Sequence, residues 1–239
     1  MHIEVENLSF RYPDGHLALD GVSFSVAAGE KAGLVGHNGA GKSTLLLQLI
    51  GILRGRGHIR IDGLTLSDET VRRIRSKVGL VFQDPNDQLF SPTVFDDVAF
   101  GPLHMGLPEE EVRARVERAL AQVRMSAFAQ RMPHHLSVGE KKRIAIATVL
   151  SMEPIILALD EPSAGLDPQG RRELIALLQR LPQTMLIASH DLELVRQVCD
   201  RALVMTTGRV VAELPPAQLP QHEALLYPQE LLAASPSLP

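Results

Sequence analysis

The stretch Gly36-His37-Asn38-Gly39-Ala40-Gly41-Lys42-Ser43-Thr44 decides the fold class of this chain. It satisfies the pattern G-x-x-x-x-G-K-[ST], follows an apolar run that ends at Val35, and opens the apolar stretch Leu45-Leu46-Leu47. In this strand-to-helix setting, glycines let backbone N–H groups turn toward an anion, and the helix N-terminus adds partial positive charge. We expect Lys42 to reach the terminal phosphates of a nucleotide and the Ser43 hydroxyl to ligate Mg²⁺.

Short apolar runs recur along the chain and alternate with stretches of helical pattern. The runs lie at residues 33–35, 78–82, 155–159 and 185–188, and helices are expected over 42–52, 109–123, 137–152, 168–181 and 191–199. Continuous apolar runs between helices indicate an α/β protein with a mostly parallel sheet that is covered on both faces. Residues 3–10 and 22–27 instead alternate apolar with polar side chains, which predicts an N-terminal antiparallel β subdomain.

The domain limits follow from composition. The block at about 84–150 is mostly helical and lies between two sheet strands, so it predicts a helical lobe beside the P-loop core. Prolines recur from residue 215 onward, which places the end of the main domain, residues 1–213, before a Pro-rich C-terminal tail at 214–239. Within that tail, a short helix at Glu223 to Tyr227 is expected to dock, and the last residues are expected to be mobile.

Charge and hydropathy exclude several classes of function. The 24 Lys and Arg residues against 28 Asp and Glu residues give a net charge of −4, which offers no electrostatic footprint for nucleic acid. No apolar run approaches the roughly 18 residues that span a bilayer, and the N-terminus lacks the basic and apolar blocks of a signal peptide. With a single cysteine, Cys199, an internal disulfide is impossible, and we expect a cytoplasmic protein.

A second phosphate-site element follows the apolar run at 155–159. Asp160 and Glu161 come directly after this run, where a strand of the parallel sheet is expected to end. Adjacent residues at a strand end point in different directions, so the two carboxylates can have separate tasks. We expect Asp160 to hold the Mg²⁺ shell and Glu161 to polarise the attacking water.

The order of motifs resembles that of an ATP-binding-cassette (ABC) ATPase over about residues 1 to 213. The motifs are Gly36 to Thr44, Gln83, Leu136-Ser137-Val138-Gly139-Glu140, Asp160-Glu161, Ser163-Ala164-Gly165-Leu166-Asp167 and Ser189-His190-Asp191. The stretches 81–90, 97–102 and 140–147 are similar to those of the energy-coupling-factor importers, in particular their cobalt or nickel branch.

This resemblance implies ATP and Mg²⁺ as cofactors and gives the residues roles. It implies adenine stacking by Tyr12, although that ring could also simply cover the first sheet, and catalytic contacts by Gln83 and His190 beside Glu161. It implies that Mg²⁺ is held by Ser43, Gln83 and Asp160. Nucleotide binding is implied for Gly36, Asn38, Gly39, Ala40, Gly41, Lys42, Ser43, Thr44, Ser137, Gly139, Glu140 and Asp167.

The stretch Leu136 to Glu140, called the signature below, departs from the family's Leu-Ser-Gly-Gly-Gln at Val138 and Glu140. Ser137 can still cap the following helix, and Ser137 with Gly139 can still bind a γ-phosphate. Val138 lacks the conformational freedom of glycine, and Glu140 brings an anion close to the nucleotide. We expect retained activity, with a slower or asymmetric site as the alternative.

The family's geometry implies partners for the chain. The signature closes over ATP that is held by another protomer, and Asp167 links the two sites, so a second cassette is required. The dimer is formed either by identical chains, which is the expectation, or with a homologue. Transport requires separate integral membrane subunits, expected to dock near Gln83 to Phe90, with the chain peripheral at the cytoplasmic membrane face. Leu89, Phe90 and Phe95 offer apolar contacts there, although these side chains could instead pack inside the lobe. The alternatives are a soluble ABC ATPase outside transport and a regulatory, weakly hydrolytic cassette.

Overall fold

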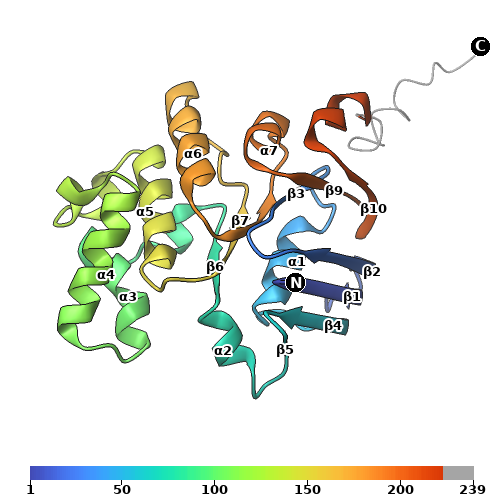
Figure 1. Cartoon of the computed structure of the whole chain (residues 1–239), viewed down its shortest axis with the longest axis horizontal. Helices are drawn as coiled ribbons and strands as arrows, with labels where there is room; N and C mark the ends of the chain where they lie inside the picture. The colour runs from blue at the N-terminus through green and yellow to red at the C-terminus, as the bar shows by residue number, and fades with distance from the viewer. Residues whose placement is uncertain (223–239) are drawn as a thin grey trace, which may run out of the picture.

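Two β-sheets form the frame of the protein, which we describe from a computed structural model covering residues 1–222 (Figure 1). The antiparallel sheet has the order β2-β1-β4-β5, with β1 at Ile3–Arg11, β2 at Leu17–Val26, β4 at Arg56–Ile61 and β5 at Leu64–Thr65. The second sheet has the order β10-β9-β3-β8-β7-β6 and is parallel except for the edge strand β10. The predicted α/β class, with a parallel sheet and an antiparallel β subdomain, is confirmed.

Four of the six strands of the second sheet, β3, β6, β7 and β8, match the apolar runs of the sequence. The six strands are β3 at Lys31–Val35, β6 at Val78–Val81, β7 at Ile156–Asp160, β8 at Thr184–Ala188, β9 at Arg201–Thr206 and β10 at Arg209–Leu214. In β7 every residue is buried, because Ile156 and Ala158 face one hydrophobic core while Leu157 and Leu159 face the other. Burial on both faces explains why β7 is apolar up to its last residue, Asp160.

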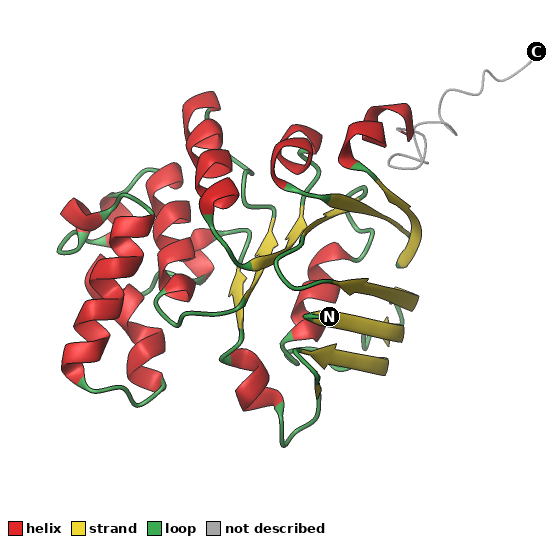
Figure 2. Cartoon of the chain, viewed as in Figure 1, coloured by secondary structure: helices red, strands yellow, loops and turns green. Residues whose placement is uncertain are grey.

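The helices lie on both sides of this sheet (Figure 2). They are α1 at Lys42–Leu49, α2 at Val71–Arg75, α3 at Val94–His104, α4 at Glu109–Gln122, α5 at Val138–Leu150, α6 at Pro168–Arg180 and α7 at Leu192–Val198, with short 3-10 turns η1 at Pro85–Asp87, η2 at Ser126–Phe128, η3 at Pro133–His135 and η4 at Pro216–His222. Helix α1 packs against the core of the antiparallel sheet, and α3, α4 and α5 form the helical lobe on the left of Figure 1. Among the described helices, none is both long and apolar enough to cross a bilayer.

Several element boundaries differ from those expected. Helix α1 ends at Leu49 rather than residue 52, because Gly51 takes a positive φ of 65° and its N–H closes a turn on Gln48 O. Strands β4 and β10 were not predicted, because exposed residues recur along both of them. Strand β9 was not predicted either, although its four central residues are buried. The core also continues past residue 213: Leu219, in η4, is fully buried. The predicted helix at Glu223 to Tyr227 and the end of the tail lie outside the described residues.

Candidate functional site

The phosphate loop joins β3 to α1 and depends on glycine where the backbone turns. Gly39 and Gly41 have φ values of +82° and +102°, in the left-handed region that side chains disfavour. A Cβ atom on Gly41 would also lie 2.5 Å from the carbonyl oxygen of Ala18. Lys42 is buried, and its ammonium group donates to the carbonyl oxygens of Gly36 (2.8 Å) and His37 (3.2 Å). The loop therefore holds its lysine pointing back into the turn.

Residues far apart in the sequence line one cavity of about 460 Å³ beside this loop. Most of the predicted ATP-site residues are among them, and Ala40 and Gly36 support the loop from behind, since Ala40 is fully buried and Gly36 binds Lys42 through its carbonyl. The lining residues are Tyr12, His16, Ala18, Asn38, Gly39, Gly41, Lys42, Ser43, Thr44, Gln83, Glu161 and His190. The structure thus brings together the phosphate loop, the predicted base and a tyrosine.

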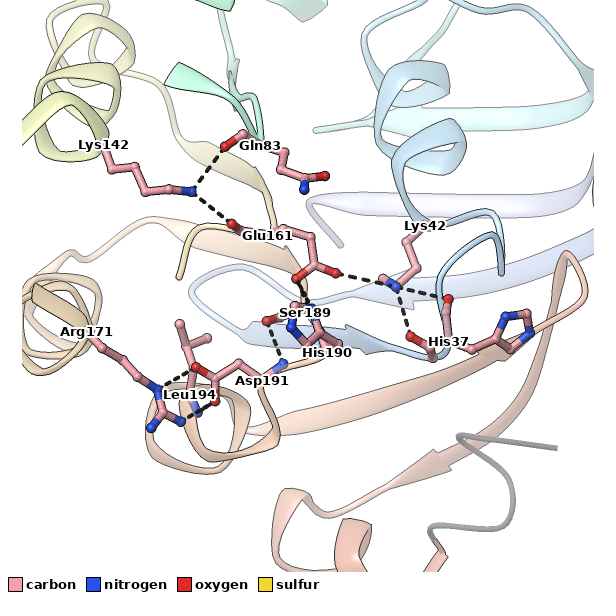
Figure 3. A network of polar contacts seen from close by, with 11 residues as sticks. His37, Lys42, Gln83, Lys142, Glu161, Arg171, Ser189, His190, Asp191 and Leu194 are labelled. Carbon is pink, nitrogen blue, oxygen red and sulfur yellow. Dashed lines mark hydrogen bonds and ion pairs between the residues drawn. The ribbon is translucent and has the colours of Figure 1, made fainter. Parts of the chain in front are cut away.

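Glu161 lies at the centre of a polar network in this cavity (Figure 3). Its Oε2 atom accepts hydrogen bonds from His190 Nδ1 (2.8 Å) and His190 N (3.2 Å), and its Oε1 atom lies 3.5 Å from the Lys42 ammonium nitrogen. The side chain is only about 7% exposed, so these interactions fix a carboxylate that is largely removed from bulk water. A buried carboxylate beside the phosphate loop is suited to orienting and deprotonating a water molecule.

The backbone of Glu161 is strained. Its φ of +43° lies in the left-handed region, which costs a residue with a side chain about 1–2 kcal/mol. The Glu161 N–H donates to Ala188 O at 2.8 Å, and its carbonyl accepts from Lys142 Nζ at 3.1 Å. Bonds from two other elements therefore hold the turn that directs the carboxylate toward Lys42.

Asp160 ends β7 beside Glu161 and is also buried. Burial raises the pKa of this carboxyl above its usual value, and the negative charge of Glu161 adds to the rise, while a hydrogen bond from Ser43 and the charges of Lys42 and Lys142 oppose it. Among the described residues, neither Asp160 Oδ1 nor Glu161 Oε1 has a hydrogen-bond partner. A buried oxygen without a partner, close to a serine hydroxyl, matches the oxygen ligands that Mg²⁺ prefers.

Tyr12 also lines the cavity. Its hydroxyl is 3.0 Å from Thr44 Oγ1, its ring packs edge-on against Phe10, and His16 stacks nearly parallel to it with ring centroids 6.4 Å apart. Both readings made from the sequence are compatible with this position, because the ring packs on the first sheet and also faces the cavity. Adenine stacking by Tyr12 stays a prediction.

His190 is held in place by its neighbour in the chain. Asp191 caps α7 by accepting from Leu194 N at 3.0 Å, and Arg171 of α6 forms a two-pronged ion pair with its carboxylate. Although burial opposes the effect, the hydrogen bonds from Arg171 and Leu194 N keep the pKa of Asp191 below its usual value. This pair anchors the loop after β8, from which His190 reaches Glu161.

The signature residues line a different cavity, of about 400 Å³, between the N-termini of α5 and α6. It contains Ser137, Gly139, Glu140 and Asp167, and no residue that lines it also lines the cavity at the phosphate loop. Asp167 caps α6 by accepting from Gly170 N at 2.7 Å. The four predicted signature-side residues are thus together, yet they are not part of this chain's own phosphate site.

Glu140 completes a capping box with Ser137. Its Oε2 atom accepts from both Ser137 N and Ser137 Oγ at 2.8 Å, while the Glu140 N–H donates back to Ser137 Oγ at 3.3 Å. The hydrogen bond from Ser137 N lowers the pKa of Glu140, so the carboxylate is ionised at neutral pH. The Ser137 hydroxyl, which is expected to contact a γ-phosphate, therefore donates its hydrogen bond to the Glu140 carboxylate of the same helix.

Lys142 is the site residue that the sequence reasoning missed. It is only 5% exposed and donates to the carbonyl oxygens of both Gln83 and Glu161 at 3.1 Å (Figure 3). Burial lowers the pKa of its ammonium group, and the nearby charges of Glu161, Asp84 and Asp160 oppose this shift. The spacing of apolar residues gives no signal for it, because the adjacent Lys141 also precedes buried residues by three and four positions.

Of the two alternatives for the apolar residues near Gln83, packing inside the lobe holds for Leu89 and Phe95 but not for Phe90. Leu89 is buried and Phe95 packs on the core, while Asp97 is buried and accepts from the N–H groups of Phe90 and Ser91. Phe90 alone of the three remains on the surface, at 65% exposure, where its ring meets Phe100 edge-on. These two rings border an open groove of about 1030 Å³ that runs from the lobe to α2.

Comparison with known proteins settles the family. A family model described as ABC transporter matches residues 19–164. The chain belongs to the ABC transporter ATPase family. The energy-coupling factor transporter ATP-binding protein EcfA of Carboxydothermus hydrogenoformans is 54% identical over 215 residues, which cover 88% of this chain and 80% of that protein. The predicted resemblance to the energy-coupling-factor group is thereby confirmed.

Two solved structures match this ABC ATPase over almost its whole length. CbiO1 from Clostridium perfringens, described as part of the ABC transporter complex cbiONQ, is 41% identical with a TM-score of 0.84 over 96% of this chain and 94% of that one. The dimeric post-hydrolysis state of the cassette MJ0796 with ADP and Pi is 28% identical with a TM-score of 0.79, covering 90% and 98%. The protein is an ATPase, as predicted.

Replacing Glu161 by Gln tests the role of the buried carboxylate. Glutamine keeps the size of the side chain but removes its basicity, so we expect ATP hydrolysis to fall by about two orders of magnitude or more while ATP still binds. Turnover and nucleotide affinity are measured on the same preparation, with Glu109→Gln, at the exposed start of α4, as the matched control. Parent-level hydrolysis by Glu161→Gln would refute the assignment.

Proposed function

We propose that the protein is the ATP-hydrolysing subunit of an energy-coupling-factor importer for cobalt or nickel ions, working as a homodimer below separate membrane subunits. The observation that carries this proposal is the division of the site: the phosphate loop and the signature lie in separate cavities of one chain. Each cavity is half of a nucleotide site, so a second copy of this chain is the simplest partner that completes both halves.

Within the phosphate half, the residues divide the chemistry. Lys42 exchanges its carbonyl partners for the terminal phosphates of ATP, and Tyr12 offers its ring to adenine. Ser43, Gln83 and Asp160 would hold Mg²⁺, which would neutralise charge on the phosphates when bound. Glu161 accepts a proton from the attacking water, and His190 donates to the γ-phosphate region while its Nδ1 atom stays bonded to Glu161.

The signature half binds the γ-phosphate of the partner protomer through Ser137 and Gly139 at the N-terminus of α5. Glu140 must then release the Ser137 hydroxyl, to which it is bonded in the free chain. Closure by ATP and opening after hydrolysis would drive the transport cycle, with Asp167 at the interface between the two sites. The hydrogen bond between Glu140 and Ser137 is also the one observation that favours a regulatory, weakly hydrolytic cassette. The contacts of the Glu161 carboxylate with His190 and Lys42 favour hydrolysis instead.

Docking of the membrane subunits is proposed at the groove between the helical lobe and α2. Its exposed apolar side chains are Phe90, Phe100 and Met105, and Arg72 and Arg75 of α2 border the opposite wall. An apolar groove of about 1030 Å³ is suited to an amphipathic helix from a membrane subunit. Its connection to Gln83 through the 3-10 turn η1 would link docking to the nucleotide site.

The cobalt or nickel cargo rests on two likenesses. The stretches 81–90 and 140–147 resemble the corresponding stretches of that branch, and the CbiO1 structure belongs to a protein described as part of the cbiONQ complex. The test is uptake by liposomes that contain the chain with its co-purified membrane subunits. We expect ATP-dependent accumulation of cobalt or nickel that is lost with Glu161→Gln, whereas ATP hydrolysis without uptake of either ion would contradict the cargo assignment.

Replacing Phe100 by Asp tests the docking groove. A charge on this half-exposed ring position should weaken binding of an apolar helix, so we expect the membrane subunits to be lost from the purified complex. Val211→Asp, on the exposed face of β10, is the matched control and should leave the complex intact. Soluble ATP hydrolysis should be unchanged in both variants. Retention of the membrane subunits by Phe100→Asp would place docking elsewhere.

A further inference from the structure

Helix α5 and its N-cap carry two polar side chains that reach different parts of the molecule. Ser137, at its N-terminus, opens into the signature cavity, while Lys142, five residues later, reaches the strand ends beside the chain's own phosphate cavity. At a rise of about 1.5 Å per residue, these positions are about 7.5 Å apart along one rigid helix. A displacement of the signature therefore moves Lys142 as well.

The two carbonyl groups bound by Lys142 belong to the backbone that positions the hydrolytic groups. Gln83 follows β6 and lines the phosphate cavity, and Glu161 follows β7, the neighbouring strand of the sheet. In Figure 3 the Lys142 ammonium lies between the two carbonyls, on the side of the strand ends opposite to Lys42. One ammonium group thus joins the lobe to both strand ends.

Packing alone does not account for a lysine at this position. An isolated buried ammonium is costly unless it is bonded, and an apolar side chain would cover the same helix face without that cost. Lys142 instead donates to two main-chain oxygens, one of them in the strained turn at Glu161, where φ is +43°. The contact restrains a backbone conformation that few residues adopt unaided.

We propose that Lys142 is a positioning residue that couples the signature helix to the hydrolytic groups, setting the backbone of Gln83 and Glu161 when α5 engages the partner's nucleotide. The proposal rests on the homodimer proposed above. Lys142 does not touch the nucleotide in this role. It acts on the rate of hydrolysis through Gln83 and Glu161, while nucleotide binding depends on Lys42 and dimer closure depends on Ser137 and Gly139.

The test compares Lys142→Met with Lys141→Met. Methionine keeps the length of the side chain but removes the charge and the donors. Lys141 is the adjacent residue on the same helix, yet it donates to the Asn86 side chain at 2.9 Å rather than to a strand end, so it provides a matched control. We expect Lys142→Met to lower kcat about tenfold while KM for ATP changes by less than about twofold, and Lys141→Met to stay within about twofold of the parent in both.

A second measurement separates positioning from a general loss of structure. In the Glu161→Gln background, adding Lys142→Met should leave the ATP concentration for half-maximal dimerisation within about twofold, as measured by light scattering. If Lys142→Met fails to fold by circular dichroism, Lys142→Gln, which is too short to reach both carbonyls, takes its place with the same expectations.

Unchanged kcat in a folded Lys142 variant, or equal loss of kcat and of ATP-driven dimerisation, would overturn the positioning role. Failure of the Glu161→Gln variant to dimerise with Mg-ATP would instead refute the homodimer. This outcome is measured on the variant that keeps Lys142, so the two failures can be told apart.

Discussion

The shared edge of the parallel sheet is the constraint on which the site depends. Strands β3, β6, β7 and β8 all end at this edge, and each is followed by a functional residue: the phosphate loop, Gln83, Asp160 with Glu161, and His190. Because the strands are parallel and adjacent, their carboxyl ends lie side by side, and short loops are enough to bring the functional residues together. The apolar core on both faces then makes this edge rigid.

The sheet edge fixes where the functional residues lie, and hydrogen bonds and ion pairs fix the directions of their side chains. Glu161 is directed by a strained backbone, by His190 and by Lys142, and His190 is directed in turn by the cap at Asp191 and its ion pair with Arg171. These bonds come from the sheet, the lobe and α6, so the base is positioned by several parts of the chain at once. Such a site responds to movement of the lobe, as a motor that couples nucleotide to transport requires.

The sequence was informative where one local pattern determines the outcome. The phosphate loop, the apolar strands and the acids after residue 159 each depend on neighbours in the sequence, and the structure places them as expected. The sequence was less informative where contacts between residues far apart in the chain decide whether a side chain is buried. The sequence left open whether Leu89 and Phe95 pack inside the lobe, and the structure packs both on the core. It gave Lys142 no role, although this side chain is buried and donates to two distant carbonyls. The end of the core was placed too early because burial of Leu219 depends on packing rather than on pattern.

Mixing two inactive variants tests most directly whether the nucleotide site is shared between two chains. Ser137→Arg should lose its signature but keep its phosphate loop, whereas Lys42→Ala should lose its loop but keep its signature. In a mixed dimer, one intact loop faces one intact signature, so titrating one variant into the other should raise ATP turnover above that of either alone. Full ATPase activity in Ser137→Arg alone would contradict a signature that acts on the partner's nucleotide.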